Sequence, residues 1–386
     1  MTDYGEKQRS MSPLFVSSFL SGSVLIGMSP ALPSIMEEMK LSDSMGGLLA
    51  STYLIGTMVS IIALNFLFAK WTSRFSIILY SSISAFALLG LGLSKSFFLA
   101  AIANLVVGFS NGALLTYPGM VASSYNRHET DKMVNFLYGT LAIGIIIWSP
   151  IEGAIISSGA SWRMCFYIPA AANILLLILA YAMPPPDIPD RSNLNIIKVI
   201  EFLRHDFGLF AGIASSIFVY VAAEHIINVW GPKYFQAVFP FAGIITASIV
   251  PSMFWMGLAL GRMIAGKWLC NYPVRLLIII LALSSWVIWL SVIFANSPIT
   301  AIIGIALLGL AFSAIWPLLI SCSNQFPGQG SSMVFSLFVA IGALGGATGT
   351  NIFGVLADFM GFRLALGICS FFIPTIVVIV VKRLQS

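Results

Sequence analysis

Hydrophobic residues run through this chain in long stretches separated by short polar breaks. A helix needs about 20 apolar residues to cross the ~30 Å of hydrocarbon in a bilayer, and only helices or closed barrels satisfy their backbone groups there. The runs are continuous rather than alternating, which excludes a barrel. Breaking the chain at charges and at Gly, Pro and Asn clusters predicts twelve spans, at residues 12–36, 46–69, 75–94, 97–122, 133–157, 164–184, 207–230, 241–266, 276–295, 299–323, 331–357 and 364–381.

The stretch from Leu276 to Ala357 tests this number of spans. It contains no Asp, Glu, Lys or Arg, and it is too long for one or two helices. Turn-forming clusters at 296–298 (NSP) and 324–328 (NQFPG) divide it into three spans.

A weak internal repeat appears when the chain is shifted against itself by about 200 residues, as in transporters built from parallel repeats. The matched features are Ser51 and Gly56 with Ser252 and Gly257, Tyr117-Pro118 with Trp316-Pro317, and Gly159 and Arg163 with Gly361 and Arg363. Their common order predicts a duplicated six-helix unit.

The longest polar segment, residues 185–206, lies between the sixth and seventh spans, and an interfacial helix is expected from Asn195 to Phe207. We interpret it as a cytoplasmic linker between bundles at 1–185 and 207–386. The predicted fold is therefore an all-α membrane protein with twelve transmembrane helices in two pseudo-symmetric six-helix bundles.

Composition and charge agree with this picture. The chain is 59% hydrophobic and only 9% charged, so lipid rather than water surrounds most of it. The net charge of +5 could suggest nucleic acid, but 14 of the 19 Lys and Arg residues fall in loops on the side of the termini, as the positive-inside rule describes. We expect a multi-pass protein of an inner (plasma) membrane with cytoplasmic termini and no nucleic-acid partner.

Several chemical classes lack the motifs they would need. There is no phosphate-binding GxxxxGK[ST] string, the four cysteines share no metal-ligand spacing, and polar residues do not cluster as an enzyme site would require. We expect no metal, no cofactor and no enzymatic activity. A membrane enzyme and a non-transporting sensor or channel remain the alternatives from other classes.

The chain resembles the major facilitator superfamily along its whole length, through its twelve spans, parallel repeat and central linker. Three strings carry the resemblance: GVLADFMGFR at 354–363, GRMIAGK at 261–267 followed by Arg275, and SPIEG at 149–153, which is similar to a fifth-span signature of antiporters. The resemblance implies gating roles for Arg262, Lys267 and Arg275. Asp358 and Arg363 are expected to form a contact within one turn.

Other features depart from the family pattern. The loop after the second span, AKWTSRFS at 69–76, lacks the usual aspartate and glycines. Glu224 followed by Trp230 in the seventh span is similar to the fucose-permease branch, but spans one and four lack the acids that this branch uses for proton coupling.

Ionisable residues inside a span are costly and therefore suggest function. Glu224 is the main candidate for proton coupling, and a permanent hydrogen bond to a neighbouring helix is its structural alternative. His225 is adjacent but about 100° around the helix, and it could titrate with Glu224 or bind substrate. Glu152 in the fifth span could line an outer vestibule or serve only packing.

Uncharged polar and aromatic residues complete the candidate cavity, although each alone could be interhelical packing. They are Asn104, Asn111, Thr116, Tyr117, Tyr220, Trp316 and Asn351.

We therefore predict a monomeric secondary transporter that moves a small organic solute by alternating access, with protons and the bilayer as its other partners. Import of a sugar-like or other polar metabolite and export of a drug, siderophore or secondary metabolite both remain open.

Overall fold

The computed structural model describes residues 2–67, 73–125, 130–182, 207–268, 272–321 and 330–383. Within these ranges twelve helical segments are long and apolar enough to cross a membrane, which confirms the predicted fold class. The predicted linker at 186–206 and the turn cluster at 324–328 lie outside the described residues.

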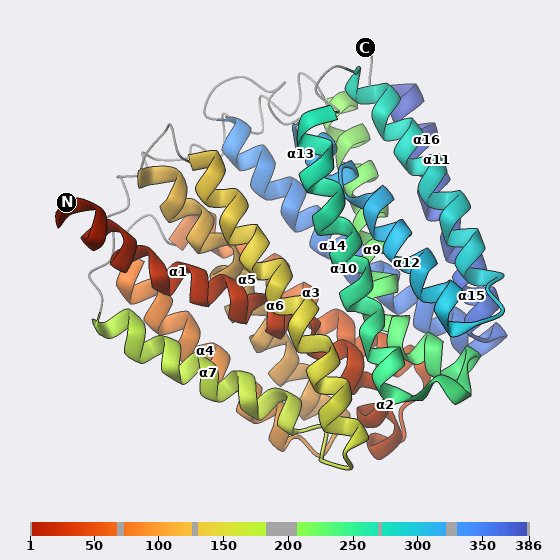
Figure 1. The fold of residues 1–386 in the computed structure, drawn as a ribbon, viewed down its shortest axis with the longest axis horizontal. Helices are drawn as coiled ribbons and strands as arrows, with labels where there is room; N and C mark the ends of the chain where they lie inside the picture. The colour runs from red at the N-terminus through yellow and green to blue at the C-terminus, as the bar shows by residue number, and fades with distance from the viewer. Residues whose placement is uncertain are drawn as a thin grey trace.

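The first half of the chain forms six spans, which lie to the left in Figure 1 and run from red to yellow-green. They consist of α1 (Thr2–Ile26) with α2 (Met28–Met39), α3 (Asp43–Leu67), α4 (Ser73–Leu93), α5 (Phe97–Tyr125), α6 (Thr130–Ser157) and α7 (Met164–Ala182).

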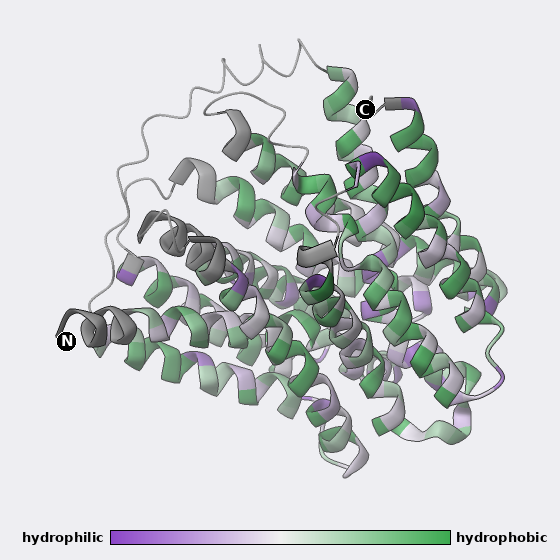
Figure 2. Ribbon diagram, turned by 45° about the horizontal axis from the view of Figure 1, so that its top comes forward, coloured by the Kyte–Doolittle hydropathy of each residue, from purple (hydrophilic) through white to green (hydrophobic). Residues whose placement is uncertain are grey.

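The second half also forms six spans, drawn in green to blue on the right of Figure 1. They consist of α9 (Phe207–Val238), η2 (Pro240–Ala242) with α10 (Gly243–Trp268), α11 (Val274–Ile293), α12 (Pro298–Phe312) with α13 (Ile315–Ser321), α14 (Gly330–Met360), and α15 (Phe362–Ser370) with α16 (Phe372–Arg383). Apolar residues dominate the described helices of both halves (Figure 2).

Three spans are broken into two helices, which the hydropathy pattern did not predict. In each, a proline follows four residues after the point where the first helix ends. The pairs are Ile26 with Pro30, Ser313 with Pro317, and Ser370 with Pro374. Proline has no N–H to bond the carbonyl four residues earlier, so each break leaves a free carbonyl.

The predicted repeat is visible in how the helices pack. A Cβ on Gly56 of α3 would lie 2.0 Å from the Leu105 carbonyl oxygen of α5, and one on Gly257 of α10 would lie 1.9 Å from the Ala306 oxygen of α12. Such close approach of two backbones is possible only because these positions carry no side chain. The second pair stands 201 residues after the first, which places the same close contact in both halves.

The two halves meet where α3 packs on α14, α6 on α10 and α2 on α9. Serine side chains donate across these seams to backbone carbonyls of the opposite half. The pairs are Ser51 to Ala347 at 2.7 Å, Ser149 to Ser248 at 2.6 Å, Ser252 to Ile146 at 2.9 Å, and Ser29 to Asn228. Hydroxyl-to-carbonyl bonds of this kind join helices without a buried charge.

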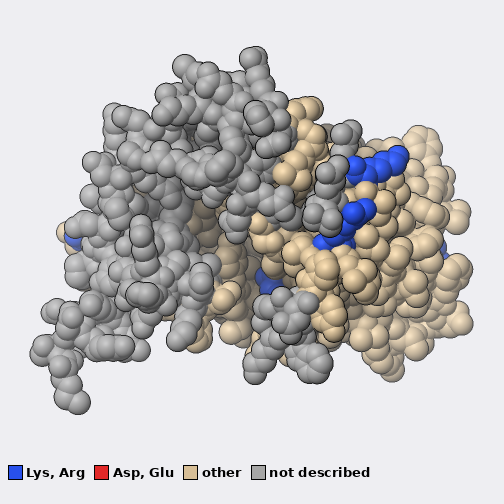
Figure 3. Space-filling model, turned by 90° about the horizontal axis from the view of Figure 1, so that it is seen from above, with Lys and Arg blue, Asp and Glu red and all other residues tan. Residues whose placement is uncertain are grey.

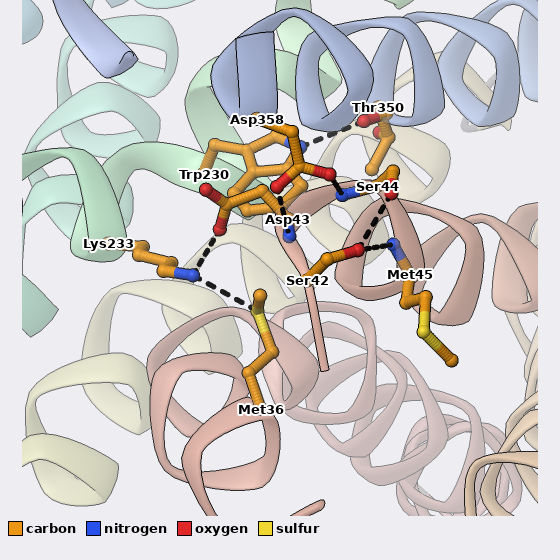
Figure 4. Close-up of polar contacts among 9 residues, drawn as sticks. All are labelled: Met36, Ser42, Asp43, Ser44, Met45, Trp230, Lys233, Thr350 and Asp358. Atoms are coloured by element: carbon orange, nitrogen blue, oxygen red, sulfur yellow. Dashed lines mark hydrogen bonds and ion pairs between the residues drawn. The ribbon is translucent and has the colours of Figure 1, made fainter. Parts of the chain in front are cut away.

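The end of the molecule opposite the termini is closed by charged contacts between the halves (Figure 4). The Asp358 carboxylate accepts hydrogen bonds from the backbone N–H groups of Asp43 at 2.7 Å and of Ser44 at 2.8 Å, and Lys233 pairs with the Asp43 side chain. The contact expected between Asp358 and Arg363 is therefore not formed. Asp358 instead caps the first turn of α3, where the helix dipole favours a negative charge.

Candidate functional site

A cavity of about 230 Å³ lies between the two halves. Several lining residues stand near helix ends on the side of the termini, among them Ile61 of α3, Thr116 of α5, Tyr138 of α6 and Phe335 of α14. The cavity therefore reaches toward that side, while the opposite end is closed by the contacts around Asp358. Figure 3 looks onto the side of the termini, where the surface is hollowed between the halves and the described charged side chains are Lys and Arg.

The two walls of the cavity differ in charge. The second half contributes Glu224, His225 and Arg262, whereas the polar groups from the first half are uncharged hydroxyls such as those of Tyr53 and Thr57. The remaining lining residues are mostly aliphatic or aromatic. A ligand would therefore meet its charged partners on one side and a neutral, largely apolar surface on the other.

Glu224, the main sequence candidate, lines this cavity from α9 and is half-buried. Tyr220, one turn earlier on the same face, is fully buried and near enough for its side chain to interact with the carboxyl group. The Tyr220 hydroxyl also donates to the Phe312 carbonyl at 3.3 Å. These contacts place Glu224 beside the point where α12 ends.

Arg262 lines the same cavity from α10, although the sequence placed it in an inner gate. Its Nε donates to the Ser313 carbonyl at 3.5 Å, the carbonyl that Pro317 leaves without a helical partner. Gly261 lets α10 approach, because a Cβ there would lie 2.3 Å from the Ser313 hydroxyl. Arg262 thus lies near enough to Glu224 to act on it electrostatically.

His225 stands at the inner limit of the cavity. Its ring lines both the main cavity and a much smaller one, and Nδ1 lies 3.1 Å from the Val221 carbonyl oxygen. A carbonyl only accepts, so this bond requires Nδ1 to carry a proton, and in the neutral imidazole Nε2 is then the acceptor.

Two tryptophans form aromatic walls of the cavity. Trp316, a sequence candidate, lies with its ring centroid 6.3 Å from that of Tyr220. Trp255, which the sequence analysis missed, donates from Nε1 to Asn228 Oδ1 at 3.0 Å and is thereby fixed in orientation. Trp255 stands two helical turns before Arg262 on the same face of α10, and that spacing was the available signal.

The asparagine candidates of α5 face other helices instead of the main cavity. Asn104 donates to the Leu49 carbonyl at 2.9 Å and to Thr52 at 3.1 Å, and it lines only the small cavity. Asn111 is fully buried and donates to the Ser21 carbonyl at 3.0 Å and to the Tyr53 hydroxyl at 2.6 Å. These bonds join helices of the first half, and neither residue lines the main cavity.

The other candidates divide in three ways. Asn351 is half-buried outside the main cavity, and Arg275 ties α11 to α16 through the Val381 carbonyl at 2.9 Å. The side chains of Tyr117 and Lys267 lie outside the described part of the structure. Among the residues that are described, no three His, Cys, Asp or Glu side chains gather as a metal site would require.

Glu152 does not line the cavity but is buried inside the first half with no exposed surface. Neither carboxyl oxygen makes a hydrogen bond, although the Trp148 indole and the Cys165 thiol lie near enough to interact electrostatically or by a poorly aligned contact. A Cβ added at Gly27 would lie 3.3 Å from its Oε1, which places Glu152 at the break between α1 and α2. The outer vestibule expected at Glu152 is absent from this closed arrangement of the described residues.

A family model described as Major Facilitator Superfamily matches residues 14–350. The chain belongs to this superfamily. Over 283 residues it is 23% identical to AraJ of Escherichia coli (strain K12), a transporter by name, in a match that covers 70% of this chain and 69% of AraJ. As a superfamily member with this architecture, it is a multi-pass membrane transporter of a small molecule.

Two solved structures share the fold. The nucleoside transporter NupG, in the form of a point mutant, superposes with a TM-score of 0.83 at 14% identity, covering 97% of this chain and 100% of NupG. A D-xylose-proton symporter superposes with a TM-score of 0.82 at 17% identity and covers 98% of each chain.

Proposed function

We propose that this superfamily member is a proton-coupled secondary transporter that carries a small organic solute by alternating access between residues 1–185 and 207–386. Glu224 is the group that binds and releases the coupling proton. The observation that carries this proposal is the position of Glu224, an acid within a membrane span that lines a cavity between two halves closed at the far end.

Coupling follows from the cost of a charge in a membrane protein. A carboxylate in a span is stable only with water, a proton or a cationic partner. When the halves close around a solute and exclude water, protonation of Glu224 would lower the cost of the occluded state and so link solute to proton. The fold shared with a D-xylose-proton symporter is consistent with such coupling.

We further propose that the side of the termini is cytoplasmic and that the protein lies in an inner (plasma) membrane. The basic residues of that side support this orientation. The cavity then faces inward. One chain completes the cavity, which supports a monomer as the transport unit.

Two observations bear on the class of solute. NupG transports nucleosides and the symporter takes xylose, which favours a polar metabolite. The largely apolar wall contributed by the first half and the two tryptophans favours a solute with an apolar body, as an exporter of drug-like or secondary metabolites would carry. His225 is proposed to bind solute or proton beside Glu224, and Lys267 and Arg275 to act with Arg262 at the inner gate.

The proposal is tested in proteoliposomes with an imposed pH gradient and a radiolabelled panel of a pentose, a nucleoside, an aromatic carboxylate and an aromatic amine. We expect wild-type protein to accumulate at least one class of solute inside the liposomes. Glu224→Gln should lose this accumulation but still exchange the same solute across the membrane. Glu37→Gln is the matched control, because Glu37 is an exposed acid on the outer side and does not line the cavity. Gradient-driven accumulation that persists in Glu224→Gln would remove Glu224 from the coupling mechanism.

A further inference from the structure

We propose that the solute is an organic monoanion with an apolar body, such as an aromatic carboxylate, and that Arg262 binds its carboxylate when Glu224 is protonated. This inference rests on the proposed function and deepens it by assigning the solute class. It starts from how Arg262 and Glu224 are placed in the cavity.

Arg262 and Tyr220, the residue one turn before Glu224, bond two adjacent peptide groups. Arg262 bonds the Ser313 carbonyl through Nε at 3.5 Å, and Tyr220, one turn from Glu224, bonds the adjacent Phe312 carbonyl at 3.3 Å. Both Glu224 and Arg262 line the cavity. An acid and a base therefore line one wall of a common space, near enough to interact electrostatically but not paired as an ion pair.

The guanidinium group of Arg262 has donors to spare. Its one hydrogen bond within the described residues leaves from Nε, and no carboxylate there lies within ion-pair distance. The two terminal nitrogens of arginine form a planar fork that matches a carboxylate with two parallel hydrogen bonds. Arg262 is also the only Lys or Arg among the described lining residues.

Charge balance links this fork to the proton. Before the solute binds, ionised Glu224 would balance the charge of Arg262 within the same cavity wall. An arriving carboxylate adds one negative charge, and a proton bound by Glu224 removes one, so the net charge of the cavity stays at zero. A buried charge left unbalanced would be costly, so anion and proton bind together.

Among the described residues that line the cavity, Arg262 of α10 is the only one with a permanent positive charge. The other titratable side chains among them, besides Glu224, are Tyr53 of α3, Tyr138 of α6 and the neighbouring His225. The His225 ring lies at the border with the smaller cavity and is bonded to the Val221 carbonyl through Nδ1. In its neutral form this imidazole can orient a ligand, but it does not balance a carboxylate.

The remaining walls fit an apolar or aromatic body. Trp255 and Trp316 supply flat faces from the second half, and Leu54, Leu115 and Leu141 supply aliphatic surface from the first half. A sugar would leave most of its hydroxyl groups unpaired on this surface, which is costly. A ring with one carboxylate would satisfy its charge at Arg262 and bury its apolar faces.

Thermal unfolding of the purified full chain tests the proposal, because ligand binding to the native state raises the melting temperature. The probes are benzoate, 4-hydroxybenzoate, indole-3-acetate and 2-naphthoate, each compared with its neutral amide, and benzylamine as a cation. We expect at least one carboxylate, and not its amide, to raise the melting temperature of wild-type protein. Arg262→Gln should abolish this shift, and Arg262→Lys, which keeps the charge but not the fork, should reduce it.

The dependence of binding on pH separates this mechanism from simple charge attraction. Between pH 8 and pH 6 the probe carboxylates stay ionised, so uptake of one proton by Glu224 should tighten their binding by up to about tenfold per pH unit. In Glu224→Gln the binding should be as tight as that of wild type at low pH and should not change with pH.

Two outcomes would overturn the inference. One is stabilisation by the amides or the amine but by no carboxylate, and the other is carboxylate binding that Arg262→Gln leaves intact. Either result would reject the anion assignment. The proposed function would still stand if another solute is transported in a way that depends on Glu224 and on the pH gradient. If gradient-driven transport persists in both Glu224→Gln and Arg262→Gln, the anion assignment and the proposed function are both rejected.

Discussion

The carboxylate of Asp358, at the end of α14, accepts a hydrogen bond of 2.7 Å from the backbone N–H of Asp43 at the start of α3. This bond joins the last part of the second half to the first half, across the end of the molecule that is closed. The bond gives a partner to a backbone N–H that has none within its own helix. It also places a negative charge at the N-terminus of α3, the positive end of the helix dipole. Such a contact can exist only while this end stays shut, so it stabilises the present state over the one that opens there.

Replacing Asp358 with asparagine should shift the protein toward opening at this end. The amide keeps one acceptor oxygen but loses the charge, and weakening a helix cap typically costs about 1 kcal/mol, or roughly a fivefold change in population. Spin labels at Lys40 and Phe241, two exposed positions of opposite halves, would report the distance between the halves at the closed end in a cysteine-free background. A distance distribution identical to that of the Glu37→Gln control would refute a latching role for Asp358.

Close packing of α10 on α12 predicts a specific loss of stability. Gly257→Ala would place a Cβ 1.9 Å from the Ala306 carbonyl oxygen, so the two helices would have to separate, at a cost of typically about 1–3 kcal/mol. Gly139→Ala in α6 is the matched control, because nothing lies within 4 Å of its Cβ and alanine is the better helix former. Tryptophan-monitored thermal unfolding in detergent should show a lower midpoint for Gly257→Ala only, and equal midpoints would contradict the packing argument.

The spans and part of the site could be predicted from the sequence because both depend on local properties. A run of about 20 apolar residues has few structural options in lipid, and an acid such as Glu224 within a run points to an interior surface. Glu224, His225 and Trp316 do line the cavity. Their chemistry and depth along the helix were sufficient for this placement.

The direction in which a polar residue faces was harder to predict. Asn104 and Asn111 have the same depth and chemistry as a cavity residue, but the angle of α5 turns them toward Leu49 and Ser21. That angle is set by packing against neighbouring helices, whose residues lie far away in the sequence. The residues around Asn104 and Asn111 therefore do not reveal it. The position of Arg262 depends likewise on a carbonyl freed by Pro317 in a different span.

This difference between helix packing and cavity lining predicts opposite phenotypes for two variants. Asn104→Ala removes two interhelical hydrogen bonds and should lower the free energy of unfolding by about 1–3 kcal/mol while leaving solute affinity unchanged. Trp316→Ala removes an aromatic wall of the cavity and should weaken binding of the same solute severalfold or more. Thermal unfolding and equilibrium binding measured on both variants check this, and a weaker affinity in Asn104→Ala would restore Asn104 to the site.

Glu152 provides the sharpest test of where the proton binds. Its carboxyl group is fully buried without a hydrogen bond, and an uncompensated carboxylate there would be so costly that the group must hold its proton. Glutamine has nearly the same shape and is neutral, so Glu152→Gln imitates the protonated acid. Because the cavity does not reach Glu152, we expect solute-coupled proton flux in proteoliposomes to match wild type, whereas Glu224→Gln should abolish it. Loss of proton flux in Glu152→Gln, with solute exchange preserved, would mean that this acid releases its proton in another state of the cycle and that the first half carries part of the coupling.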